Sequence, residues 1–198
     1  MRLFYSPTSP FVRKVMVAAK LRGLAERIEL IPCNPHESPP ALLAANPLSK
    51  VPAMETPDAG ALVDSLVICE YLDTLGDAPR LIPEAGLARV AVLQAHAIAD
   101  GILDAAVARR GLSLQPVDDA RRAQDARLAG AISRALAWFE ARPLPEAMDL
   151  AAVTLGCALG YLDFRFGHEP WRPVHPRLAD WFQGVSALPA FRETAPIA

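Results

Sequence analysis

The chain has 198 residues, with 20 basic and 22 acidic side chains, so it can form one large domain or two small ones. A net charge of −2 without a long run of like charges argues against a nucleic-acid-binding surface, which needs a basic patch. The three cysteines (Cys33, Cys69 and Cys157) are far apart and form no Cys-x-x-Cys pair, which argues against a disulfide framework and a structural zinc site.

We predict neither a secretory signal nor a membrane-spanning segment. No apolar run of signal-peptide length follows the basic residue near the start. Polar residues interrupt the apolar stretch 90–108, and the stretch 150–162 is too short to cross a bilayer. We therefore expect a cytoplasmic protein with no membrane or nucleic-acid partner. The positive mean hydropathy of +0.19 favours an apolar surface buried in a homodimer, with helix 87–112 as the best candidate.

Residues 1–76 alternate short strands and helices. Ser9 is predicted to cap a helix that has Pro10 in its first position and ends near Gly23. Ser65 is predicted to cap a second helix, which ends near residue 76. Strands are expected at 2–5, 29–33, 53–56 and 61–63, with a short helical turn at 41–45. The order is βαβαββα, and the tight turn between the last two strands predicts an antiparallel pair.

The rest of the chain has a different amino-acid composition. Residues 77–86 are polar and contain proline, which is typical of a linker. Residues 87–198 are rich in alanine, leucine and arginine, and helices are predicted near 87–112, 118–141, 149–166 and 176–187. Asp118 and Asp149 are the predicted N-caps of the second and third of these helices. The fold class is therefore an α/β unit followed by an all-α unit.

The Ser9 hydroxyl has the position of an anion-stabilising group. It lies at the positive end of a helix dipole, beside unpaired backbone N–H groups. No histidine is positioned to activate it as a nucleophile, but it can donate a hydrogen bond to a bound thiolate. Lowering a thiol pKa from about 8.5 to about 6.5 makes the thiolate the major form at neutral pH. Taken alone, a plain capping serine is the favoured interpretation.

Two further segments can recognise the backbone of a peptide-like ligand. A cis bond before Pro52 would let Val51 offer its own N–H and C=O to an extended ligand. Ser65 and the helix amides behind it can hold a carboxylate, while Asp64 can pair with an ammonium group. Each segment alone also fits an ordinary strand start or a capped helix.

The three segments in this order resemble the cytosolic glutathione transferases, and most closely their bacterial YibF-like subgroup. The resemblance is carried by Tyr-Ser-Pro-Thr-Ser-Pro-Phe-Val-Arg-Lys-Val, Asn-Pro-Leu-Ser-Lys-Val-Pro, Asp-Ser-x-x-Ile-x-x-Tyr-Leu, Ala99–Asp104 and Ala158–Arg165. It implies a thioredoxin-like glutathione-binding domain at 1–76, a linker at 77–86, and a helical-bundle domain at 87–198. The helical domain would hold the co-substrate pocket and the dimer interface.

The resemblance also implies roles for single residues. Ser9 takes the place of the thiol-contacting residue; omega-type relatives have Cys-Pro-Phe where this chain has Ser9-Pro10-Phe11, so mixed-disulfide chemistry is disfavoured. Thr8 is the alternative hydroxyl. Phe11 is the best candidate for a pocket wall. The remaining implied glutathione contacts are Val51 and Pro52 for the cysteinyl backbone, Asp64 and Ser65 for the γ-glutamyl end, Lys50 for a carboxylate, and Asp100 across a dimer interface.

Other candidates are given structural interpretations. The three cysteines are expected to be buried and inert. His96 has no partner ligand at a metal-binding spacing, and Arg109-Arg110 fits a solvated helix face better than a site for an acidic co-substrate. Tyr161 and Phe164 fit the core better than a co-substrate pocket, and Trp171 is an open candidate. Asp149 caps its helix without the family's usual capping box, because Ala152 stands at the reciprocal position.

The resemblance implies an enzyme that binds glutathione and transfers its sulfur to a small hydrophobic electrophile, as in detoxification. Two alternatives remain: a glutathione-dependent isomerase or dehalogenase, and a binding or regulatory protein without turnover. Glutathione is the only co-substrate expected from these motifs, with no metal and no nucleotide. The identity of the electrophile does not follow from the sequence.

Overall fold

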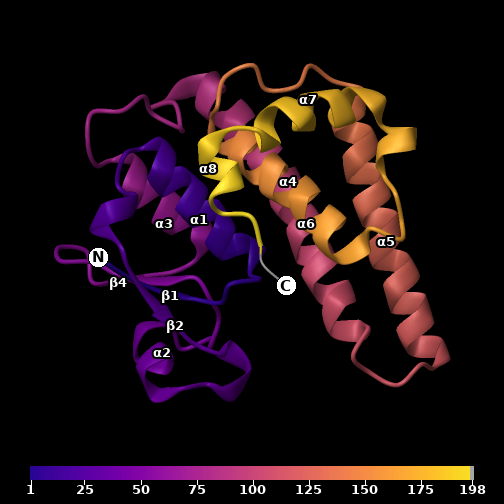
Figure 1. Cartoon of the computed structure of the whole chain (residues 1–198), viewed down its shortest axis with the longest axis horizontal. Coiled ribbons are helices and arrows are strands. Elements are labelled where there is room, and N and C mark those ends of the chain that lie inside the picture. The colour runs from indigo at the N-terminus through magenta and orange to yellow at the C-terminus, as the bar shows by residue number, and fades with distance from the viewer. Residues whose placement is uncertain (197–198) are drawn as a thin grey trace. The chain divides into compact units, whose positions relative to one another are not determined.

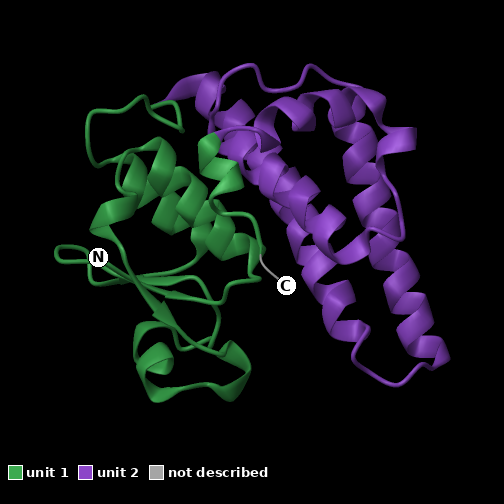
Figure 2. Ribbon diagram, viewed as in Figure 1, with its two compact units in different colours: residues 1–84, 189–198 green, residues 85–188 purple. Residues whose placement is uncertain are grey.

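The computed structural model describes residues 1–196, which form two compact units (Figure 2). The first unit contains residues 1–84 together with the C-terminal residues from Pro189 onward, and the second contains residues 85–188. The boundary in the sequence analysis was drawn at the linker 77–86, with all later residues in the helical domain. In the structure, most of that segment and the last helix pack with the first unit.

A four-stranded mixed sheet forms the centre of the first unit. The strands are β1 (Arg2–Tyr5), β2 (Glu29–Pro32), β3 (Ala53–Glu55) and β4 (Ala61–Leu62), in the spatial order β2-β1-β3-β4. β1 pairs with β2 in parallel and with β3 antiparallel, and β3 pairs with β4 antiparallel. The predicted order of strands and helices along the chain and the antiparallel last pair are confirmed.

Helices cover both faces of this sheet. α1 (Pro10–Leu21) and α3 (Ser65–Asp73) lie on one side, and α2 (Pro40–Ala45) lies on the other (Figure 1). Two short 3₁₀ helices, Ala25–Arg27 and Pro35–Glu37, lie in the connections around β2. Strand alternation directs Phe4 and Ala53 to the α2 side, where they pack with Leu42 and Ala45.

Of the two N-caps predicted in the first unit, one is confirmed and the other is wrong. Ser9 caps α1 as predicted, with its Oγ accepting from Val12 N at 3.3 Å. The prediction that Ser65 caps α3 is wrong, because Asp64 is the N-cap. Asp64 has an extended backbone, and its Oδ1 accepts from Leu66 N at 3.0 Å, whereas Ser65 is already helical.

A buried ion pair anchors the segment after α3 to the first unit. Arg22 and Asp73 are 3% and 2% exposed, with Nε and Oδ1 3.6 Å apart. Arg22 donates to the carbonyls of Leu75 and Ala78, and Asp73 accepts from the backbone N–H groups of residues 81 and 82. These bonds explain why a segment with the composition of a linker belongs to the first unit.

The last helix, α8 (Pro189–Arg192), is anchored to α1 by two cations. Arg13 donates to the Phe191 carbonyl at 3.0 Å and lies over its ring, with 5.8 Å between the guanidinium carbon and the ring centroid. Lys20 pairs with Glu193 at 2.7 Å. These contacts place the C-terminal helix in the first unit rather than in the helical bundle.

The second unit is a bundle of α4 (Gly86–Leu112), α5 (Asp119–Glu140), α6 (Leu150–Phe166) and α7 (Pro176–Ser186), with a 3₁₀ helix at Arg172–Val174. α6 is apolar and almost fully buried, as its sequence predicts. Asp118 and Asp149 cap α5 and α6 as expected. Glu140 caps α7 from outside the helix, since its carboxylate accepts from the backbone N–H groups of residues 177 and 178.

α4 is the one helix in the described part of the chain that is long and apolar enough to cross a membrane by length and composition. A core helix of a soluble protein passes the same test. α4 packs against α5 and α6, and it buries the polar side chains of His96 and Arg109 within this unit. His96 Nδ1 lies 2.9 Å from Thr154 Oγ1. We therefore describe α4 as a bundle helix.

Candidate functional site

The sheet topology brings the three predicted ligand-binding segments of the first unit to one edge. β1 ends at Tyr5, just before the loop that leads to Ser9. Because β3 is antiparallel to β1 and Ala53 lies opposite Phe4, the Val51–Pro52 pair lies at the same edge. β4 runs parallel to β1 across β3, so Asp64 also follows a strand that ends there. Segments more than 50 residues apart in the sequence therefore lie at the same edge of the sheet.

Ser9 is positioned to interact with an anion at this edge. Its hydroxyl oxygen accepts from Val12 N–H, and a hydroxyl that accepts in this way still has its own proton to donate. The side chain is half-buried, which reduces the solvent screening of a charge held beside it. Thr8, the alternative hydroxyl, is also half-buried but is not the residue that caps the helix.

The peptide bond between Val51 and Pro52 is cis, as the sequence analysis anticipated. The preceding loop is organised by Asn46, a residue that the sequence analysis did not single out. Its Nδ2 donates to the Lys50 carbonyl at 2.8 Å, and its Oδ1 accepts from Leu48 N at 3.0 Å. The signal that could have found it is the Asn-Pro pair, since asparagine before a turn bonds its own backbone.

We expect Asn46→Ala to weaken ligand binding at this edge and to lower stability. Asn46 is 2% exposed, so its removal leaves partly buried backbone groups of the loop without partners, at about 1 kcal/mol for each lost bond. Thermal unfolding and a glutathione titration of the variant measure both effects. Asn34→Ala is the matched control, because Asn34 precedes another proline and makes similar local bonds on an exposed loop. Equal effects of the two substitutions would contradict the role assigned to Asn46.

The other predicted contacts of the first unit have different exposures. Asp64 and Lys50 are exposed, Val51 and Phe11 are half-buried, and Ser65 is 2% exposed. Ser65, the first residue of α3, is therefore almost inaccessible to solvent. The ring centroid of Phe11 lies 5.7 Å from Lys14 Nζ.

Asp100, the last predicted contact, lies half-buried on α4 in the second unit. None of the three cysteines forms a disulfide bond in the described residues. Cys69 and Cys157 are buried as expected, whereas Cys33 is half-buried, and desolvation raises the pKa of its thiol. A raised pKa keeps Cys33 protonated and unreactive at neutral pH. In residues 1–196, no group of three or more His, Cys, Asp or Glu side chains is placed to hold a metal ion.

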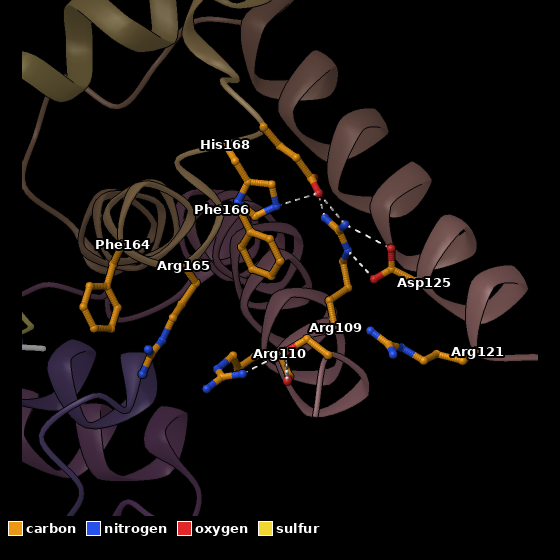
Figure 3. Close-up of a pocket in the computed structure, with 10 residues that line it drawn as sticks. Arg109, Arg110, Arg121, Asp125, Phe164, Arg165, Phe166 and His168 are labelled. Carbon is orange, nitrogen blue, oxygen red and sulfur yellow. Dashed lines mark hydrogen bonds and ion pairs between the residues drawn. The ribbon is translucent and has the colours of Figure 1, made fainter. Parts of the chain in front are cut away.

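The second unit contains a cavity of about 380 Å³ where α4 and α6 end and α5 begins (Figure 3). Arg109 lines this cavity and is only 7% exposed. The interpretation of this residue as part of a solvated helix face is therefore wrong. Its guanidinium binds Asp125 through two bonds of 2.9 and 3.1 Å and Glu169 through two bonds of 2.8 and 2.9 Å. The hydrogen bonds from Arg109 lower the pKa of both carboxyls. Phe164 is half-buried and lines the same cavity.

This double ion pair predicts an acid-sensitive contribution to stability. Because the folded pKa of Glu169 is lowered, the contribution is fully present above the unfolded value of about 4.3 and is lost as the pH falls through the folded value. We expect Glu169→Gln to cost about 1 kcal/mol at pH 7, since Glu169 is partly exposed, and to cost less at pH 3. Urea unfolding at both pH values checks this, with the exposed Glu146→Gln as control. A cost that does not change with pH would argue against the ion pair.

Comparison with known protein families gives one match in each of the two units. Residues 8–75 match the glutathione S-transferase N-terminal domain, and residues 101–184 match the glutathione S-transferase C-terminal domain. The glutathione-transferase-like protein YibF of Escherichia coli K12 is 29% identical over 201 residues, which cover 99% of this chain and 98% of that protein.

Solved structures agree over the full length. A glutathione transferase family member from Pseudomonas fluorescens Pf-5, crystallised with glutathione, is 39% identical with a TM-score of 0.94, and the match covers 100% of this chain and 99% of that one. A glutathione S-transferase from Methylobacillus flagellatus, also with glutathione bound, is 33% identical with a TM-score of 0.86, over 99% of each chain. The first unit is thioredoxin-like, the second is the helical domain that accompanies it, and the chain belongs to the glutathione transferase family.

Proposed function

We propose that the protein binds glutathione at the edge of the sheet where Ser9, Val51 and Asp64 converge, and transfers its sulfur to a small electrophile. The observation that carries the proposal is the Ser9 hydroxyl, which accepts from Val12 N–H at the start of α1 and keeps a proton to donate. Glutathione in two relatives at least 33% identical supports the choice of ligand. The Pseudomonas protein was also crystallised with S-(propanoic acid)-glutathione, a thioether of the kind such a transfer produces.

Each predicted residue has one task in this proposal. Val51 pairs its backbone with the cysteinyl backbone beside cis Pro52, and Asp64 and Ser65 bind the γ-glutamyl ammonium and carboxylate. Lys50 meets a second carboxylate from the exposed side, and Phe11 forms a wall next to the sulfur.

Ser9 donates to the sulfur and lowers the pKa of the thiol, because hydrogen bonding favours the charged form. The thiolate then attacks the electrophilic carbon, the C–S bond forms, and the leaving group departs with its bonding electrons. Holding both reactants together supplies much of the acceleration. These residues need no metal or nucleotide for this step.

The proposal includes a cytoplasmic homodimer that acts in detoxification. Support for a covered surface comes from α4, whose Leu87 and Val90 are 86% and 58% exposed, although α4 as a whole is apolar. In such a dimer, Asp100 would reach the glutathione of the partner subunit. Equilibrium sedimentation measures the dimer directly.

Calorimetric titration with glutathione, combined with an aryl-halide conjugation assay, tests the function. We expect saturable binding and chloride release that depends on glutathione. Absence of binding at millimolar glutathione would falsify the proposal. Binding without conjugation of any halide or isomerisation of any test substrate would instead indicate a binding or regulatory protein. Catalysis without a stable conjugate would indicate the isomerase or dehalogenase chemistry.

A further inference from the structure

The cavity of the second unit has an unusual balance of charge. Four arginines and two carboxylates line it, so its net charge is +2 with His168 neutral, whereas the whole chain has −2. Both carboxylates, Asp125 and Glu169, are engaged by Arg109. Local positive potential of this kind attracts small anions.

Two arginines of the cavity, Arg110 and Arg165, have no ion pair within residues 1–196. Arg121 faces the Asp125 carboxylate, whose pKa its charge helps to lower. Arg110 donates to Ser113 Oγ at 2.8 Å, and Arg121 donates to the Gln115 carbonyl, so each guanidinium keeps further donors for a ligand. Arg110 and Arg165 come from the ends of α4 and α6, and both point to the lower left in Figure 3, whereas Arg121 approaches from α5 at the right.

Arg165 has a guanidinium that is only partly satisfied. Its Nε is buried and has no hydrogen-bond partner, while the group interacts with the Tyr161 hydroxyl. Its guanidinium carbon lies 4.1 Å from the ring centroid of Phe164. This contact with the ring holds the planar guanidinium in a fixed orientation before a ligand binds. A planar, fixed guanidinium recognises a planar oxyanion such as a carboxylate through paired hydrogen bonds.

The other side chains of the cavity favour an anion that carries a flat, apolar ring. The rings of Phe164 and Phe166 line the cavity, and Phe166 is itself backed by Arg109, with 4.6 Å between the guanidinium carbon and the ring centroid. The volume of about 380 Å³ lies in the range of roughly 300–1,000 Å³ that is typical of small-molecule sites.

We propose that this cavity binds a small aryl carboxylate, with the carboxylate on Arg110 and Arg165 and the ring on Phe164 and Phe166. This binding is independent of the proposed glutathione chemistry.

To test the site, calorimetry without glutathione compares the affinities of 4-chloro-3-nitrobenzoate and its uncharged analogue 4-chloro-3-nitrobenzamide. We expect the benzoate to bind about tenfold more tightly or better, with a preference that falls as salt is added. Arg165→Met and, separately, Arg110→Met should reduce this preference several-fold. Arg127→Met on the exposed face of α5 is the matched control and should leave it unchanged. Equal affinity for the two probes, or a preference that survives both cavity variants, overturns the site.

Discussion

Ser9→Ala should reduce kcat/KM for glutathione conjugation by about 10- to 150-fold at pH 6.5. The substitution removes a hydrogen bond to a charged sulfur, which contributes about 1.5–3 kcal/mol, and each 1.4 kcal/mol corresponds to a tenfold change in rate. The loss should shrink as the pH rises above about 8.5, because the thiol then ionises without help. The measurement is the pH profile of kcat/KM, together with the ultraviolet absorbance of the bound thiolate.

Two controls separate chemistry from helix stability. Ser9 also caps α1, so its replacement should cost about 1 kcal/mol of stability, and Asp118→Ala removes a similar cap from α5 far along the chain from Ser9. Thr8→Ala tests the neighbouring hydroxyl. If Thr8→Ala shifted the profile and Ser9→Ala did not, the thiol contact would belong to Thr8. If neither did, backbone amides would be the stabilising groups.

Asp73→Ala should lower the free energy of unfolding by about 3–5 kcal/mol. It leaves the buried Arg22 guanidinium without a counter-charge and removes the acceptor of two backbone N–H groups, at residues 81 and 82. With about 2–4 °C lost per kcal/mol in a chain of this size, the midpoint of thermal unfolding should fall by roughly 10 °C.

The exposed Asp77→Ala is the matched control, and it should change stability by less than about 0.5 kcal/mol. Asp73→Asn should have an intermediate effect, because an amide oxygen can still accept from one backbone N–H but carries no charge. A loss below 1 kcal/mol for Asp73→Ala would mean that the pair does not anchor the segment after α3.

Local signals in the sequence were sufficient for most elements of the fold. Capping residues such as Ser9, Asp118 and Asp149 mark helix starts through bonds to residues two or three positions ahead, so no distant contact is needed to recognise them. The exception at Asp64 has a local cause as well. Two adjacent residues can both cap a helix, and the choice depends on which of them has an extended backbone.

Long-range partners could not be read in the same way. Arg109 and Arg110 are neighbours on one helix, yet Arg109 is buried between Asp125 and Glu169, which come from α5 and from the loop after α6. Asn46 is a different case, because its bonds to Lys50 and Leu48 are local and the Asn-Pro pair was a signal that could have found it. Helical periodicity gives the face of a residue but not what packs against that face.

The sequence by itself determined the βαβαββα order, the helical second half and the three segments that mark a glutathione transferase, because these depend on neighbours in the chain. Only the tertiary structure decided that residues 78–82 and the last helix belong to the first unit, and that four arginines line one cavity with two carboxylates. Burial and charge pairing arise between segments that are distant in sequence, and chain folding alone brings them together.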